Sequence, residues 1–305
     1  MTSHWLTLRA GPDALTILRE RGLRAEDVEV VPGASGGAKW LALAGIDRVL
    51  FGELLHEPRQ RPLHLIGSSI GSWRMACLAQ RDPIAALARG HHAYVHEQRY
   101  TPRPSAREVT EVLGRALDTL LGDRGVEEIL SHPWFRLHVI TAEGRGLAAS
   151  ARRPLLAAAM AAAAVGNLVS RRTLGWQLRR RIFHSAGDAS PFLHLADLPT
   201  AHLPLTRDNL RAVLLASGAI PLLLEGVAVP GAPGGVHWDG GVLDYHLDLD
   251  FGRGEGLVLY PHFYAMPEGE RIRRWQAVLD AGQRTADELR ELLATGRLAD
   301  AVQPW

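Results

Sequence analysis

The stretch Gly67-Ser68-Ser69-Ile70-Gly71 decides the fold, because it joins a short apolar run to a helix-like run. A strand that turns sharply into a helix holds its turn residue in a strained backbone, and small neighbours on either side are what sterics permit there. Ser69 is therefore the predicted nucleophile, with Gly67 and Gly71 as the glycines of the elbow. The positive end of the following helix dipole would favour an oxyanion at this point. A purely structural strand-to-helix turn explains the same five residues equally well.

The composition is that of an ordinary globular protein. The chain has 305 residues, 47% of them hydrophobic and 22% charged, which suits one enlarged α/β domain. Its 34 Lys and Arg residues nearly balance its 33 Asp and Glu residues, so the net charge of +1 predicts no binding to nucleic acid. Cys77 is the only cysteine, which excludes an internal disulfide. The first residues lack the pattern of an export signal, so we expect a cytoplasmic protein.

The hydrophobic periodicity predicts strands alternating with helices. Strands are expected over 28–31, 63–66, 135–141 and 257–263, and helices over 13–21, 38–55, 72–80, 83–100, 106–121, 126–130, 206–216 and 268–295. Thr206 is the expected N-cap of its helix. We expect a single domain over residues 1–305, with helical insertions at about 83–131 and 150–181.

A glycine-rich loop, Pro32-Gly33-Ala34-Ser35-Gly36-Gly37, follows the first buried strand and leads into a long helical run. Such a loop directs several backbone N–H groups to one point, which suits an anion or an oxyanion. No dinucleotide or Walker motif can be written through it. Because strand-to-helix turns of neighbouring parallel strands share one edge of a sheet, we expect the amides of Gly36 and Gly37 to face a carbonyl attacked by Ser69.

An apolar run over 155–169 is bordered by arginines, namely Arg152, Arg153, Arg171, Arg172, Arg179, Arg180 and Arg181. The run is shorter than the roughly 20 residues needed to span a bilayer. It either lies on a lipid surface, forms a lid over an acyl pocket or packs as a buried alanine helix. The segment 155–181 is therefore a candidate for peripheral contact with a membrane surface.

Asp239-Gly240-Gly241 places a carboxylate on a turn with little bulk around it. Taken alone, these residues predict only a turn. Polar side chains alternate beyond it, at Asp244, His246, Asp248 and Asp250. On one face of an extended segment they would form either an oxygen-ligand cation site or a solvated edge strand, and the edge strand is the simpler prediction.

Three blocks, in this order, resemble the patatin-like phospholipase family: Ser35-Gly36-Gly37-Ala38-Lys39, Gly67-Ser68-Ser69-Ile70-Gly71 and Asp239-Gly240-Gly241. The segment Ala216-Ser217-Gly218-Ala219-Ile220-Pro221 is similar to the family's helix end before the Asp-Gly-Gly turn. The resemblance covers scattered blocks between Val28 and Leu243. It implies a three-layer α/β/α sandwich around a mostly parallel sheet, with a helical insertion as a candidate lid.

By that resemblance, Ser69 would be the nucleophile and Asp239 its partner in a Ser-Asp dyad. The implied reaction is hydrolysis of a lipid ester, such as a phospholipid, through an acyl-Ser69 intermediate. A carboxylate can accept the serine proton if poor solvation raises its basicity. No metal or organic cofactor is implied.

The resemblance also assigns the oxyanion hole to Gly36-Gly37-Ala38. Lys39 and Trp40, which follow, are candidate substrate-binding residues, although Lys39 alone would be a solvated charge. The family usually has glycine at the positions of Ser35 and Trp40, so this chain shapes the pocket mouth differently.

Three alternatives remain open at this point. The first is an α/β-hydrolase with His246 or His262 as the base, which the short interval between the glycine loop and Ser69 disfavours. The second is acyl transfer from the same acyl-serine to another acceptor. The third is a lipid-binding protein without catalytic activity.

Overall fold

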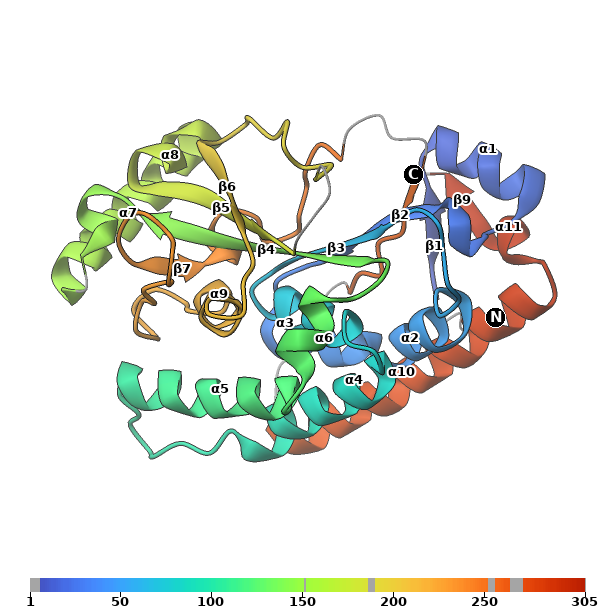
Figure 1. Cartoon of the computed structure of the whole chain (residues 1–305), viewed down its shortest axis with the longest axis horizontal. Coiled ribbons are helices and arrows are strands. Elements are labelled where there is room, and N and C mark those ends of the chain that lie inside the picture. Colours follow the sequence, from blue (N-terminus) through green and yellow to red (C-terminus); the bar gives the residue numbers. More distant parts are fainter. Residues whose placement is uncertain (1–5, 151, 186–189, 252–255, 264–270, 305) are drawn as a thin grey trace.

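The computed structural model describes residues 6–150, 152–185, 190–251, 256–263 and 271–304. Within these ranges the chain is α/β, with a mostly parallel sheet at its centre and helices around it (Figure 1). The expected fold class is confirmed at this level, and the arrangement is compatible with three layers.

The elements follow one another along the whole described chain. The strands are β1 (Leu8–Ala10), β2 (Val28–Gly33), β3 (Leu63–Ser68), β4 (Phe135–Gly144), β5 (Leu178–His184), β6 (Thr200–Pro204), β7 (His237–Asp239), β8 (Leu257–Val258) and β9 (Val302–Pro304). The α-helices are α1 (Pro12–Arg21), α2 (Ala44–Val49), α3 (Ile70–Leu78), α4 (Pro83–His92), α5 (Ala106–Leu121), α6 (Gly125–Leu130), α7 (Arg153–Val169), α8 (Leu174–Gln177), α9 (Leu210–Ser217), α10 (Arg271–Ala294) and α11 (Leu298–Ala301). Short 3-10 or π segments are η1 (Ala25–Asp27), η2 (Gly37–Leu43), η3 (Leu50–Leu54), η4 (Ala93–Glu97), η5 (Gly146–Ala149), η6 (Arg171–Thr173) and η7 (Gly240–Val242).

The central sheet has the strand order β6-β5-β4-β3-β2-β8, and β7 pairs with β4. Strands β3, β2 and β8 run parallel to β4, whereas β5 and β7 run antiparallel to it. Strand β3 pairs with β4 as far as Ser68 opposite Ile140, and β7 pairs with β4 from Asp239 opposite Thr141 onward. Strand β7 therefore continues the line of β3 beyond the turn into α3.

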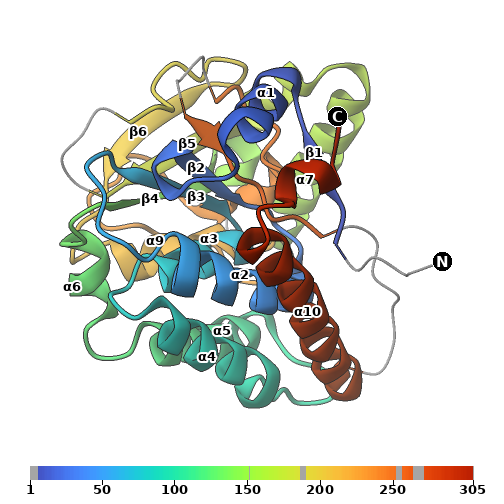
Figure 2. The ribbon, with the colours of Figure 1, turned by 90° about the vertical axis from the view of Figure 1, so that its right-hand side faces the viewer.

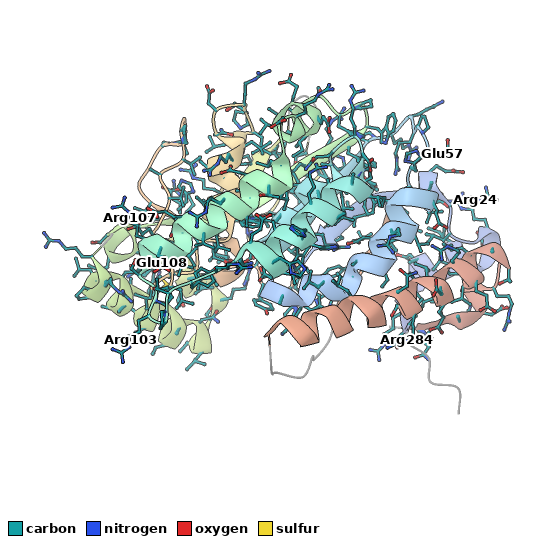
Figure 3. The ribbon with its side chains drawn as sticks, turned by 90° about the horizontal axis from the view of Figure 1, so that it is seen from below. Arg24, Glu57, Arg103, Arg107, Glu108 and Arg284 are labelled. Atoms are coloured by element: carbon teal, nitrogen blue, oxygen red, sulfur yellow. The ribbon has the colours of Figure 1, made fainter. Side chains whose placement is uncertain are left out.

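Alternate residues of the strands pack on opposite faces of the sheet. Leu65 and Val139 point into the main core, which the helices complete. Figure 2 shows α2, α3 and α9 against this face and α4 and α5 beneath them, and Figure 3 shows the outer helices from below. On the other face, Ile66 and Ile140 pack against Phe192 from a non-helical segment. Helices α1 and α7 lie at the two ends of that face (Figure 1).

Some element bounds differ from those expected. The helix predicted over 38–55 is a succession of η2, α2 and η3, and the strand predicted over 257–263 is confined to β8. Helix α9 begins at Leu210, because Thr206 belongs to a preceding turn in which its N–H donates to the Asn209 side chain. Thr206 is therefore not the N-cap. Residues 268–270 of the expected C-terminal helix lie outside the described residues.

The predicted insertion over 83–131 is helical, but the one over 150–181 ends in a strand of the central sheet. Because β5 begins at Leu178, the prediction that Arg180 and Arg181 border a surface helix is wrong. Both side chains are buried, Arg180 between Asp197 and Asp244 and Arg181 against Glu143. Among the described residues, no helix combines the length and the apolar character that crossing a bilayer requires.

Candidate active site

Ser69 occupies the strained turn between β3 and α3, with φ 55° and ψ −133°. This backbone region is rarely adopted by residues other than glycine. The flanking glycines are required by close packing, since a Cβ on Gly71 would lie 1.8 Å from the carbonyl oxygen of Gly33. A Cβ on Gly67 would lie 2.5 Å from the Cα of Ser72. The elbow expected from the sequence is thus present.

The Ser69 hydroxyl donates a 2.6 Å hydrogen bond to Oδ2 of Asp239. The other carboxylate oxygen, Oδ1, accepts the N–H of Gly241 at 2.6 Å. Burial raises the pKa of Asp239 to about 6, although both of these hydrogen bonds act to lower it. At neutral pH the carboxylate is therefore mostly ionised, yet more basic than an exposed aspartate. That combination suits a general base.

The segment that ends α9 positions both members of this pair. The Ser217 hydroxyl accepts the N–H of Ser69 at 3.0 Å and donates to the Ile140 carbonyl at 2.7 Å. The carbonyl of Ala219 accepts the N–H of Asp239 at 2.9 Å. Sequence reasoning gave these residues no role, although the Ser-Gly-Ala-Ile-Pro break in the helix pattern marked the segment.

The glycine loop adjoins the elbow. Gly36 and Gly37 have φ values of 154° and 54°, and a Cβ on Gly36 would lie 2.5 Å from the ring of Phe263. The Ser35 hydroxyl donates to the Ser68 carbonyl at 3.2 Å and lies 3.0 Å from the Ser68 hydroxyl. Ser35 therefore links the glycine loop to the residue that precedes Ser69.

The loop ends at the start of η2. Gly37 and Ala38 are its first residues, and N–H groups at the start of a helix have no acceptor within that helix. These amides, with that of Gly36, are the donors expected for an oxyanion hole.

The two residues after the loop differ in exposure. The Lys39 side chain is half-buried, with its Nζ 6.0 Å from the centroid of the Phe263 ring. Trp40 is almost fully buried and packs edge-on against the rings of His91 and Tyr94. Trp40 is therefore a core residue behind the loop, and its position does not support the prediction that it contacts substrate.

The histidines considered as alternative bases pair with each other. Nδ1 of His246 lies 3.1 Å from Nε2 of His262. The Ser69 hydroxyl, in contrast, donates its hydrogen bond to the Asp239 carboxylate. This geometry favours the carboxylate as the partner of the serine.

The prediction that the polar side chains at 244, 246, 248 and 250 share one face of an extended segment is wrong. Asp244 is buried and pairs with Arg171 and Arg180, whereas the side chains at 246, 248 and 250 are exposed. A buried arginine requires a carboxylate partner, which accounts for the inward turn of Asp244. Within the described part of the chain, no three ligating side chains gather where they could hold a metal ion.

A groove of about 340 Å³ lies between α5 and the segment that follows α9. Its apolar walls include Val109 and Leu113 of α5, together with Ile220 and the leucines at 222–224. Ile220 directly follows the residue whose carbonyl accepts the Asp239 N–H. At the other wall, the Tyr94 hydroxyl lies 3.7 Å from where a Cβ on Gly37 would be. The groove therefore adjoins both the dyad segment and the glycine loop.

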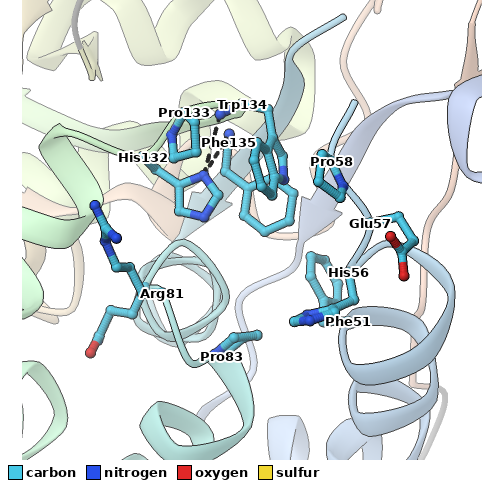
Figure 4. Close-up of a pocket in the computed structure, with 11 residues that line it drawn as sticks. Phe51, His56, Glu57, Pro58, Arg81, Pro83, His132, Pro133, Trp134 and Phe135 are labelled. Carbon is cyan, nitrogen blue, oxygen red and sulfur yellow. Dashed lines mark hydrogen bonds between the residues drawn. The ribbon is translucent and has the colours of Figure 1, made fainter. Parts of the chain in front are cut away.

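A second cavity, of about 320 Å³, lies at the opposite edge of the sheet (Figure 4). It is lined by His132, Trp134 and Phe135 at the start of β4. The Nδ1 atom of His132 accepts the N–H of Phe135 at 2.9 Å. Because β3 runs away from this edge toward Ser69, the second cavity is separate from the dyad.

Comparison with known proteins finds no family model and no curated protein that matches this chain. The function is therefore inferred from the side chains of the site.

Proposed function

We propose that this protein is a serine acyl hydrolase of the patatin-like type, which cleaves carboxylic esters of lipids. The observation that carries the proposal is the 2.6 Å hydrogen bond from the Ser69 hydroxyl to the buried Asp239 carboxylate. A strained elbow and a glycine loop beside it supply the remaining parts of an acyl-transfer site. The activity is of the phospholipase A or lysophospholipase type.

In the first half-reaction, Oγ of Ser69 attacks the ester carbonyl while its proton passes to Oδ2 of Asp239. The tetrahedral oxyanion receives hydrogen bonds from the amides of Gly36-Gly37-Ala38, and the positive end of α3 adds to its stabilisation. When the intermediate collapses, Asp239 returns the proton to the departing alcohol. The acyl group remains on Ser69 as an ester.

In the second half-reaction, a water molecule takes the place of the alcohol. Asp239 accepts one proton from the water as the water oxygen attacks the acyl carbonyl. Collapse of this second intermediate returns the proton to Oγ of Ser69 and releases the free acid. One carboxylate thus acts first as base and then as acid in each step, and a pKa of about 6 suits both roles near neutral pH.

The groove supports an apolar substrate. Its volume of about 340 Å³ is at the lower end of the ~300–1,000 Å³ typical of small-molecule sites. The leucines at 222–224 together with Val109 and Leu113 would surround an acyl chain. A groove of this size suits one chain, which favours single-chain esters such as lysophospholipids over diacyl lipids.

The test is hydrolysis of a short-chain nitrophenyl ester by the purified chain. Ser69→Ala and Asp239→Asn should each lower kcat by at least about a thousandfold. Circular dichroism should stay unchanged in both. Ser131→Ala, at an exposed serine whose hydroxyl donates to the Glu127 carbonyl, is the matched control and should retain full activity. Normal activity in Ser69→Ala would refute the proposal, and normal activity in Asp239→Asn would reassign the base.

A further inference from the structure

Helix α7 exposes an apolar face that the proposed chemistry does not use. From Leu155 to Val169 its exposed side chains are leucine, valine and alanine, with Asn167 as the polar exception. The exposed fractions reach 87% for Leu168 and 86% for Val169. Monomeric proteins rarely leave a contiguous apolar surface of this kind in water unless it binds something.

The helix is fixed to the domain by a narrow inner stripe. Leu156, Ala159 and Ala163 are buried and belong to a core cluster with Trp238 of β7. These positions are three or four residues apart, so they form one side of the helix. A helix that is apolar all round normally lies in a core or in a membrane. Here only one side is covered, and the outer side is left for a partner.

An exposed tryptophan extends this surface. Trp176 is 76% exposed and lies in α8, which packs against α7. Both helices lie at the same end of the molecule (Figure 1). Tryptophan is favoured where an apolar environment meets water, because its ring is apolar and its N–H is a donor.

Arginines gather at both ends of this surface. Between Glu143 and Asp188 the sequence has eight arginines and no acidic residue, although Arg180 and Arg181 are buried in ion pairs. Arg152 and Arg153 are exposed at the start of α7, and Arg172 is exposed just beyond its end, beside Arg171, which pairs with Asp197 and Asp244. The resulting excess of positive charge at the ends of α7 complements an anionic surface.

We propose that α7 and Trp176 form an interfacial surface that docks this protein on an anionic lipid bilayer. The apolar face would enter the region between head groups and acyl chains, while the arginines contact lipid phosphates. The surface is continuous with the groove, because Arg153 lines the groove and its guanidinium donates to the Leu222 carbonyl. A lipid leaving the bilayer would therefore reach the groove directly. Docking goes beyond the proposed hydrolysis, since it requires neither Ser69 nor Asp239.

A second copy of the chain fits this surface less well. In a two-fold symmetric contact, the same helix from each copy meets its partner. If the two copies of α7 packed antiparallel, Arg152 and Arg153 of one would face Arg171 and Arg172 of the other. Like charges juxtaposed in this way oppose association.

The test uses the Ser69→Ala chain, so that no lipid is hydrolysed, and measures co-sedimentation with vesicles. Binding is expected to vesicles of phosphatidylglycerol and phosphatidylcholine, to fall with added salt, and to be weak for phosphatidylcholine alone. The further double substitution Leu168→Asp and Val169→Asp should weaken binding at least about tenfold. Leu193→Asp, at a 55% exposed leucine outside this surface, is the matched control and should not change it.

Three results would overturn the docking proposal. The first is no binding to the anionic vesicles, and the second is an equal loss of binding in the Leu193→Asp control. The third is a concentration-dependent dimer in analytical ultracentrifugation that the Leu168 and Val169 substitutions abolish, since a second copy would then cover the surface. The chemistry is tested separately: the same double variant with Ser69 intact should hydrolyse the soluble nitrophenyl ester normally. If the unmodified chain does not hydrolyse the ester, the proposed hydrolase function is refuted. The vesicle measurements would still decide the docking proposal independently.

Discussion

Ser68 and Asp239 occupy consecutive positions along the same edge of strand β4. Ser68 pairs with Ile140 through β3, and Asp239 pairs with Thr141 through β7. The backbone of strand β4 therefore positions both the residue before Ser69 and the Asp239 backbone. Ser69 and Asp239 are 170 residues apart in the chain, yet their side chains meet in a 2.6 Å hydrogen bond. Such preorganisation is what a proton transfer in an acyl-transfer site requires.

Ser69→Gly should give a more stable protein than Ser69→Ala, although neither variant can act as a nucleophile. Alanine keeps the strain at φ 55°, whereas glycine adopts this conformation freely. Glycine loses more conformational entropy on folding than alanine, which offsets part of this gain. We therefore expect the free energy of unfolding of Ser69→Gly to exceed that of Ser69→Ala by about 1 kcal/mol. Urea denaturation measures it. Equal stability of the two variants would mean that the elbow is not strained.

The rate of ester hydrolysis should rise with pH around pH 6. The base must be ionised to accept the Ser69 proton, and burial raises the pKa of Asp239 to about 6. Below that pKa, kcat/KM should fall about tenfold for each pH unit, and above it the rate should level off. A pH profile from 4.5 to 8 checks this. A midpoint near 4 would show that the carboxylate is solvated as in an ordinary aspartate.

Gly36→Ala should lower kcat about a hundredfold, as loss of an oxyanion donor does. The added Cβ would lie 2.5 Å from the ring of Phe263, so the loop must move away from its present position. Gly52→Ala is the matched control, because its Cβ would lie at an ordinary 3.4 Å from the Ile84 side chain. Nitrophenyl ester kinetics compare the two. An unchanged kcat in Gly36→Ala would remove the loop from the mechanism.

Asp244→Ala should lower the free energy of unfolding by about 3–5 kcal/mol, because it removes a partner of the buried Arg180 guanidinium. The control is Asp118→Ala, which breaks an exposed pair with Arg211 and should cost at most about 1 kcal/mol. Urea denaturation of both variants gives the comparison. Similar losses in the two would show that Asp244 is not held in a buried ion pair.

The features that the sequence could predict are those with local signals. Helix α5 begins and ends where expected, since the Ser105 side chain accepts the N–H of Glu108 and Gly122 takes φ 58° just past its end. The elbow was equally visible, because the close packing around Ser69 admits only glycine at neighbouring positions. Such signals need only a few consecutive residues.

The features that could not be predicted depend on distant partners. Arg180 lies in an arginine-rich run typical of an exposed segment, and its burial is explained by Asp197 and Asp244, which are 17 and 64 residues away in the chain. Likewise, the role of Ser217 rests on a hydrogen bond to an amide 148 residues distant. The position of Trp40 just after the glycine loop predicts contact with substrate, but it packs in the core against the rings of His91 and Tyr94.

Covalent labelling by a fluorophosphonate probe, followed by peptide mass spectrometry, tests the Ser69–Asp239 dyad most directly. We expect one adduct on Ser69, no adduct in Ser69→Ala, and labelling of Asp239→Asn slowed at least about a thousandfold. An adduct on another residue, or undiminished labelling of Asp239→Asn, would contradict the Ser69–Asp239 dyad.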